Sequence, residues 1–136
     1  MFILSKKVEY GLIVIRHMAS GVRTQIYSAK EIADAYQIPY EILAKVMQKL
    51  SKHGFLRSFQ GTKGGYSLNR DPNEIKISEI IYAFEGKTAI SIVQCEAEEP
   101  GNCHIHNRCT IKIPVAKLQN DINKFIQDLT VTEMFS

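Results

Sequence analysis

The sequence lacks several features that would mark whole classes of protein. No apolar run approaches the roughly 18 residues of a membrane span, so we expect no membrane partner. The first basic residues, Lys6 and Lys7, follow a short apolar stretch, which is the reverse of the order in a secretory signal. There is also no nucleophile–base signature, no nucleotide-type phosphate loop and no internal repeat. These absences predict a cytoplasmic protein that is not an enzyme.

Cysteine is scarce and unevenly placed. The three cysteines, Cys95, Cys103 and Cys109, lie within fifteen residues of one another. An odd, clustered set without an export signal argues against a disulfide framework and favours metal or redox chemistry. The wide spacing does not match the close cysteine pairs of structural zinc sites. Three thiolates suit an iron–sulfur cluster with one ligand missing, for which His104 or His106 could supply a nitrogen, but buried, unrelated cysteines are the alternative.

The length and the charge pattern favour a small globular protein with a polyanionic partner. The chain has 136 residues, of which 45% are hydrophobic, and this predicts one domain with at most an appended arm. The net charge of +3 is uneven, because residues 1–76 carry twelve Lys or Arg against six Asp or Glu, whereas residues 77–136 carry five against eight. The basic first half therefore indicates binding to a polyanion such as nucleic acid.

Apolar spacing predicts three helices followed by a two-stranded hairpin. Helices are expected over residues 5–20, 28–36 and 39–52. Ser28 is suited to cap the second helix, and Pro39 to begin the third. Short aromatic runs at 55–59 and 66–68 are typical of strands, and the glycine-rich stretch between them is typical of a tight turn.

Two more helices are expected in the second half. Ser78 can cap a short helix that ends at Gly86. From Ile111 to Leu129, apolar residues repeat at steps of four and three, which predicts a long helix with a heptad-like seam. We therefore divide the chain into residues 1–86, a cysteine-containing loop at 87–110, and a dimerisation helix with a tail at 111–136.

This order of elements is typical of a winged helix-turn-helix, so the predicted fold is mainly α with a small β-hairpin, extended by a long C-terminal dimerisation helix. In such a domain the third helix enters the major groove of double-stranded DNA, and the hairpin contacts the backbone or the minor groove. The polar face of the third helix, taken alone, could simply be solvated. The adjoining glycine-rich hairpin tip favours DNA binding, because its backbone can approach phosphates closely. The candidate DNA-binding residues are Ser28, Pro39, Tyr40, Glu41, Lys45, Gln48, Lys49, Gln60, Gly61, Thr62, Lys63, Gly64 and Tyr66.

Four motifs make the chain resemble one family of bacterial regulators. They are Leu4-Ser5-Lys6-Lys7-Val8-Glu9-Tyr10, Leu43-Ala44-Lys45-Val46, Gly61-Thr62-Lys63-Gly64-Gly65-Tyr66-Ser67-Leu68 and Phe84-Glu85-Gly86. The family is that of the winged-helix iron–sulfur regulators, which includes the cluster-assembly regulator IscR and the nitric-oxide-sensing repressor NsrR.

The resemblance implies a homodimer in which each protomer holds an iron–sulfur cluster through Cys95, Cys103 and Cys109. A 2Fe–2S cluster is favoured and a 4Fe–4S cluster is possible. Some members use a histidine as fourth ligand, at the position that is Lys112 here. Others use an acidic residue of the partner's first helix, and the matching position here is Glu9. The family commonly has arginine where this chain has Gln60.

The expected function is that of a transcription regulator, a repressor that senses redox, iron or nitric-oxide status through the cluster. One alternative is a regulator that senses by cysteine oxidation without iron. Another is a scaffold that uses the winged fold for protein contacts.

Overall fold

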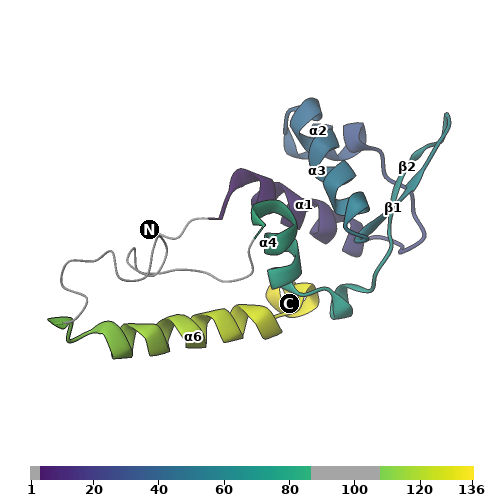
Figure 1. The fold of residues 1–136 in the computed structure, drawn as a ribbon. Helices are drawn as coiled ribbons and strands as arrows, with labels where there is room; N and C mark the ends of the chain where they lie inside the picture. Colours follow the sequence, from purple (N-terminus) through teal and green to yellow (C-terminus); the bar gives the residue numbers. More distant parts are fainter. Residues whose placement is uncertain (1–3, 87–107) are drawn as a thin grey trace.

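The computed structural model describes residues 4–86 and 108–136 (Figure 1). Its first three helices are α1 (Lys6–Ala19), α2 (Ala29–Tyr36) and α3 (Tyr40–Lys52). The Ser5 hydroxyl accepts a hydrogen bond from the Val8 N–H at 3.3 Å, and the Ser28 hydroxyl accepts one from the Glu31 N–H at 3.1 Å. Such bonds satisfy amide groups that a helix start leaves unpaired. The three predicted helices are confirmed within one residue at each end.

The predicted hairpin is also present and forms the wing. Strands β1 (Leu56–Phe59) and β2 (Gly65–Leu68) pair antiparallel, with Leu56 opposite Leu68 and Phe59 opposite Gly65. Tyr27 adds a single bridge to Tyr66, with both N–H to carbonyl distances at 2.8 Å. A Cβ atom on Gly65 would lie 2.5 Å from the Tyr27 carbonyl oxygen, so this close approach requires glycine. The base of the wing is thereby tied to the residue that precedes α2.

One hydrophobic core holds these elements together. Apolar side chains from α1, α3 and the segment after the wing are fully buried, among them Val8, Val14, Ile15, Met18, Leu43, Met47, Leu50, Ile75 and Ile80. Helix α3 places its apolar stripe against α1, so its polar residues must face outward. The core thus fixes which face of α3 is presented to a partner.

The short helix after the wing begins two residues earlier than the sequence suggests. A 3₁₀ turn at Pro72–Glu74 leads into α4 (Ile77–Glu85), which ends at Gly86 with a left-handed φ of 74°. Lys76, not Ser78, is the capping residue, because its backbone N–H donates to the Glu79 carboxylate at 2.9 Å. Ser78 is instead buried in the first turn.

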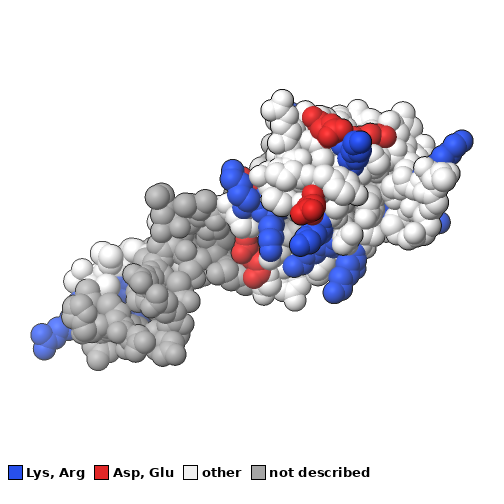
Figure 2. Space-filling model, turned by 90° about the horizontal axis from the view of Figure 1, so that it is seen from above, with Lys and Arg blue, Asp and Glu red and all other residues white. Residues whose placement is uncertain are grey.

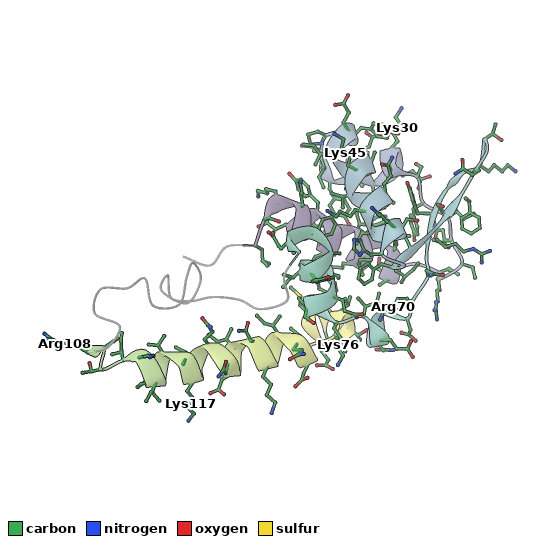
Figure 3. All side chains as sticks on the ribbon, in the orientation of Figure 1. Lys30, Lys45, Arg70, Lys76, Arg108 and Lys117 are labelled. Atoms are coloured by element: carbon green, nitrogen blue, oxygen red, sulfur yellow. The ribbon has the colours of Figure 1, made fainter. Side chains whose placement is uncertain are left out.

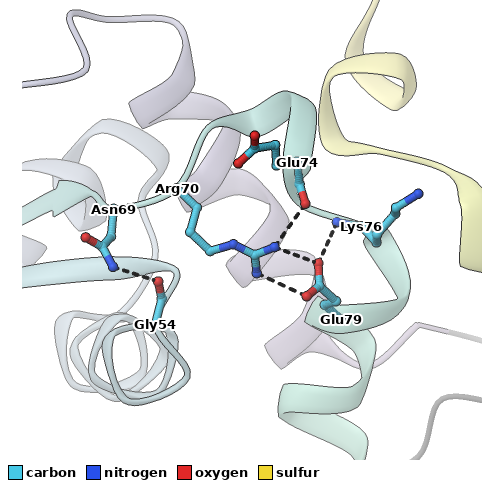
Figure 4. Close-up of polar contacts among 6 residues, drawn as sticks. All are labelled: Gly54, Asn69, Arg70, Glu74, Lys76 and Glu79. Carbon is cyan, nitrogen blue, oxygen red and sulfur yellow. Dashed lines mark hydrogen bonds and ion pairs between the residues drawn. The ribbon is translucent and has the colours of Figure 1, made fainter.

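Arg70 joins the end of the wing to α4 (Figure 4). Its guanidinium donates to both carboxylate oxygens of Glu79, at 3.1 and 3.2 Å, and to the main-chain carbonyl of Glu74 at 2.9 Å. Partial burial acts to raise the pKa of Glu79, but the hydrogen bonds from Arg70 and from the Lys76 N–H outweigh it, and the pKa lies below the ordinary 4.5.

The C-terminal part consists of two helices, α6 (Lys112–Asp128) and α7 (Val131–Phe135). Helix α6 projects away from the winged domain, and none of its residues is fully buried (Figure 1). At its end the chain turns back: the Ile77 N–H donates to the Leu129 carbonyl at 3.0 Å, and the Val131 N–H to the Ile75 carbonyl at 2.8 Å. Val131 is completely buried. The last residues therefore pack into the core of the winged domain.

Candidate functional site

The outward face of α3 carries the residues predicted to contact DNA. Glu41, Lys45, Gln48 and Lys49 are exposed, and the Tyr40 side chain is 57% exposed. Figure 3 shows Lys45 on the side of the winged domain away from α6. Since exposed side chains on one helix face can reach base edges in a major groove, the geometry is compatible with the predicted role.

Three elements meet beside the start of α3. Ser28 caps α2, and the neighbouring Tyr27 bridges Tyr66 of the wing. Pro39 is the residue immediately before α3, so it precedes the helix rather than forming its first turn. Partial burial, and then the electrostatic effect of Tyr40, raise the pKa of Tyr66 above its ordinary 10.0. The structure thus gathers predicted site residues from α2, α3 and β2.

The tip of the wing is a tight, exposed turn. Gln60, Gly61, Thr62 and Lys63 are exposed, and the Gly64 N–H donates to the Gly61 carbonyl at 3.0 Å. Gly61 has a φ of 101°, a left-handed conformation that favours glycine. Lys63 therefore stands at the far end of a hairpin whose shape depends on its glycines.

Sequence reasoning missed one cation of the wing. Arg57 is exposed on β1, and its guanidinium carbon lies 5.4 Å from the centre of the Phe59 ring. Its place within the strand predicted at residues 55–59 was the available signal.

Figure 2 shows several lysine and arginine side chains near the middle of the face in view, with acidic side chains among them, and a further basic side chain at the outer end of the wing. This distribution agrees with the basic first half of the sequence. A positive surface of this kind attracts a polyanion over several ångströms.

A pocket beside α3 was not foreseen from the sequence. It has a volume of about 270 Å³ and lies among α1, α3 and α4. Its lining residues are Lys7, Ile42, Lys45, Val46, Lys49 and Phe84. Lys7 and Phe84 come from distant parts of the chain, so no local pattern could have joined them to Lys45 and Lys49.

The predicted cluster ligands are only partly within the described structure. Cys95 and Cys103, like His104 and His106, lie outside the described residues, whereas Cys109 is half-buried shortly before α6. Glu9 is in an ion pair with Lys6, with 2.9 Å between the carboxylate oxygen and Nζ. The hydrogen bond and charge of Glu9 raise the pKa of Lys6. Residues 4–86 and 108–136 alone contain no group of three or more candidate metal ligands, so the ligand set stays a prediction.

None of the helices in residues 4–86 and 108–136 is both long enough and apolar enough to cross a membrane.

Known proteins share both the sequence pattern and the fold. Residues 4–136 match the Rrf2 family, described as iron-dependent transcriptional regulators. The regulator NsrR of Shouchella clausii is 30% identical over 109 residues, which cover 80% of this chain and 72% of that protein.

Two solved structures extend the comparison. The structure of CymR, the global cysteine regulator of B. subtilis, has a TM-score of 0.75 at 24% identity and covers 98% of this chain and 96% of that one. The oxidised form of Staphylococcus aureus CymR has a TM-score of 0.71 at 26% identity, with coverage of 98% and 95%. These similar proteins are transcriptional regulators rather than enzymes. The family match spans almost the whole chain, and the protein therefore belongs to the Rrf2 family of transcriptional regulators.

Proposed function

We propose that this protein is a cytoplasmic, homodimeric repressor that binds operator DNA and responds to redox, iron or nitric-oxide status through an iron–sulfur cluster. The observation that supports DNA binding most strongly is the joint exposure of α3 and the wing tip. The core holds the apolar stripe of α3 inward, and the bridge between Tyr27 and Tyr66 ties the wing to the residue that precedes α2. One rigid unit thus presents a helix for the major groove and a hairpin for the backbone.

The chemistry of the donor set supports the cluster. Cys95, Cys103 and Cys109 would hold it, and thiolate is the preferred ligand of iron–sulfur clusters. When bound, the cluster supplies iron that can exchange electrons or accept a small ligand at its weakest position. Glu9 of the partner protomer is our candidate for that position. To reach the cluster, its carboxylate must leave the ion pair with Lys6.

The exposed apolar residues of α6 support dimerisation. Leu118 and Phe125 are seven positions apart on the same face of α6, and they are 52% and 66% exposed. A row of large apolar side chains on a projecting helix is typical of a protein interface. In this proposal, the α6 helices of two copies cover one another.

A cluster assay tests the central part of the proposal. The protein is purified without oxygen, and visible absorbance, iron and sulfide are measured. We expect a coloured protein with iron and sulfide in near-equal amounts, and a colourless Cys103→Ala variant. Glu9→Ala should change the absorbance and speed cluster loss, with Glu98→Ala as the matched control. If protein purified from cells grown without oxygen contains no iron, the proposal that it binds an iron–sulfur cluster is wrong.

Cysteine oxidation without iron is the second candidate. The similarity to the oxidised form of Staphylococcus aureus CymR favours it, since that relative was solved in an oxidised state. Here an iron-free protein would change its affinity for DNA when treated with a thiol oxidant. Reversal by a reductant, and loss of the response in a Cys109→Ser variant, would identify this mechanism.

A further inference from the structure

We propose that the pocket among α1, α3 and α4 binds a phosphate of the DNA backbone, and that Lys7 extends the DNA interface from α3 onto α1. This inference rests on the proposed binding of DNA by α3 and the wing. It adds a residue outside the helix-turn-helix and the wing, and assigns a ligand to a pocket that has no other role.

The charges around the pocket point to an anionic ligand. Lys7, Lys45 and Lys49 line it together, and no aspartate or glutamate does. Within the described part of the chain, none of these three lysines is in an ion pair. The neighbouring Lys6, by contrast, is paired with Glu9. Three unpaired ammonium groups around one pocket repel each other, and an anion between them relieves that repulsion.

The floor of the pocket is apolar. Val46 is only 3% exposed, Ile42 is 43% exposed, and the Phe84 ring lies 5.9 Å from the Lys49 ammonium, measured to the ring centre. A nucleic-acid backbone alternates charged phosphates with largely apolar sugar faces. A cationic rim over an apolar floor therefore matches a phosphate together with its neighbouring deoxyribose.

The position of the pocket favours DNA over a free small anion. Lys45 belongs both to the pocket and to the outward face of α3, so a strand held against α3 passes the rim. Lys7 is in the first turn of α1 and lines the same pocket. A lysine on a helix that flanks the recognition helix suits a contact with the backbone, which positions the protein without reading sequence.

The test compares neighbouring lysines of the full-length protein. Lys7→Gln and Lys6→Gln remove the same charge from the same helical turn, but only Lys7 lines the pocket. Binding is measured by fluorescence anisotropy on DNA selected from a random library by the wild-type protein, over a series of salt concentrations. Lys7→Gln should weaken binding several-fold on every sequence and flatten the plot of log affinity against log salt by about one unit. Lys6→Gln should keep the wild-type slope.

Other outcomes separate this inference from the proposed function. If Lys7→Gln keeps the wild-type slope while Lys45→Ala loses affinity, DNA binding stands and the phosphate pocket is wrong. If the wild type shows no salt-dependent binding to DNA, both are wrong. If inorganic phosphate shifts the NMR signals of Phe84 at millimolar concentration, yet Lys7→Gln binds DNA like wild type, the pocket is a small-anion site and the inference is overturned.

Discussion

Glu79 shows how much a single carboxylate contributes to the joint between the wing and α4. Its oxygens accept two hydrogen bonds from Arg70 and one from the backbone of Lys76. Because the folded state lowers the pKa of Glu79, the contribution to stability is full above pH 4.5 and is lost as the pH falls through the lowered value. The side chain is 40% exposed, so solvent screening reduces the effect.

Replacement of this carboxylate should destabilise the protein in a pH-dependent way. Glu79→Gln should lower the free energy of unfolding by about 1 kcal/mol at pH 7, measured by urea denaturation. The difference from wild type should shrink below pH 4.5. Glu74→Gln is the control, since Arg70 uses only the main-chain carbonyl of Glu74. If both variants lose the same free energy of unfolding, the Glu79 carboxylate has no special role in stability.

Single residues were predictable where their partners are close in sequence. Ser28 was identified as a cap because its partner, Glu31, lies three positions on. The sequence did not reveal the pairing of Arg70 with Glu79, which depends on the path of the turn between them. Ser78 was taken for the cap because serine commonly caps a helix through its side chain, whereas Lys76 occupies the cap position and its backbone N–H donates to the Glu79 carboxylate.

Among the elements, the wing depends most visibly on backbone shape. A Cβ atom on Gly64 would lie 2.6 Å from the carbonyl oxygen of Phe59 and 2.8 Å from that of Gly61. Both neighbours are main-chain atoms that cannot move without opening the turn. Lys63 is held at the tip by this same turn.

Gly64→Ala should therefore weaken DNA binding about tenfold or more by displacing the wing tip, as measured by anisotropy. Gly54→Ala is the matched control. Gly54 has a φ of 83° with no atom near its Cβ position, so an alanine there adds backbone strain of about 1–2 kcal/mol away from the wing tip. That control should lose stability and retain its DNA affinity. Unchanged DNA affinity in Gly64→Ala would argue against a role for the wing.

The burial of Val131 in helix α7 leads to a separate prediction. Val131 is completely buried, whereas its neighbour Thr132 is exposed. Val131→Ala should lower the free energy of unfolding by about 2 kcal/mol through lost packing, and Thr132→Ala should change it by less than about 0.5 kcal/mol. Thermal or urea denaturation distinguishes the two. Similar small effects would show that the C-terminal residues are not part of the core.

Periodicity predicted the helices and strands well, but not how they meet. The apolar spacing predicts that the seam of α6 continues to Leu129. In the structure α6 ends at Asp128, and Leu129 packs against the winged core. Its pairing with Ile77 joins residues some fifty positions apart, which no local pattern encodes. In the candidate site, the exposed face of α3 and the wing could be predicted from short stretches of sequence. The pocket at Lys7 could not, because its lining residues come from three helices, α1, α3 and α4. Roles in binding DNA or iron stay predictions.

At the scale of the whole molecule, α6 extends from a compact winged domain with large apolar residues exposed. Leu118→Glu combined with Phe125→Glu should give a monomer in sedimentation velocity, because charges in an apolar seam oppose association. A Lys117→Glu variant on the same helix serves as the control for added negative charge. A soluble, intact dimer of the double variant would place the interface elsewhere.

The three cysteines lie in the chain between α4 of the winged domain and α6. In the proposed regulation, a change at the cluster therefore alters the DNA affinity of the winged domain. The most direct test is the affinity of one preparation for its selected DNA, measured before and after the cluster is removed. We predict a difference of at least tenfold, equivalent to about 1.4 kcal/mol. Equal affinities of the loaded and cluster-free protein would contradict regulation through an iron–sulfur cluster.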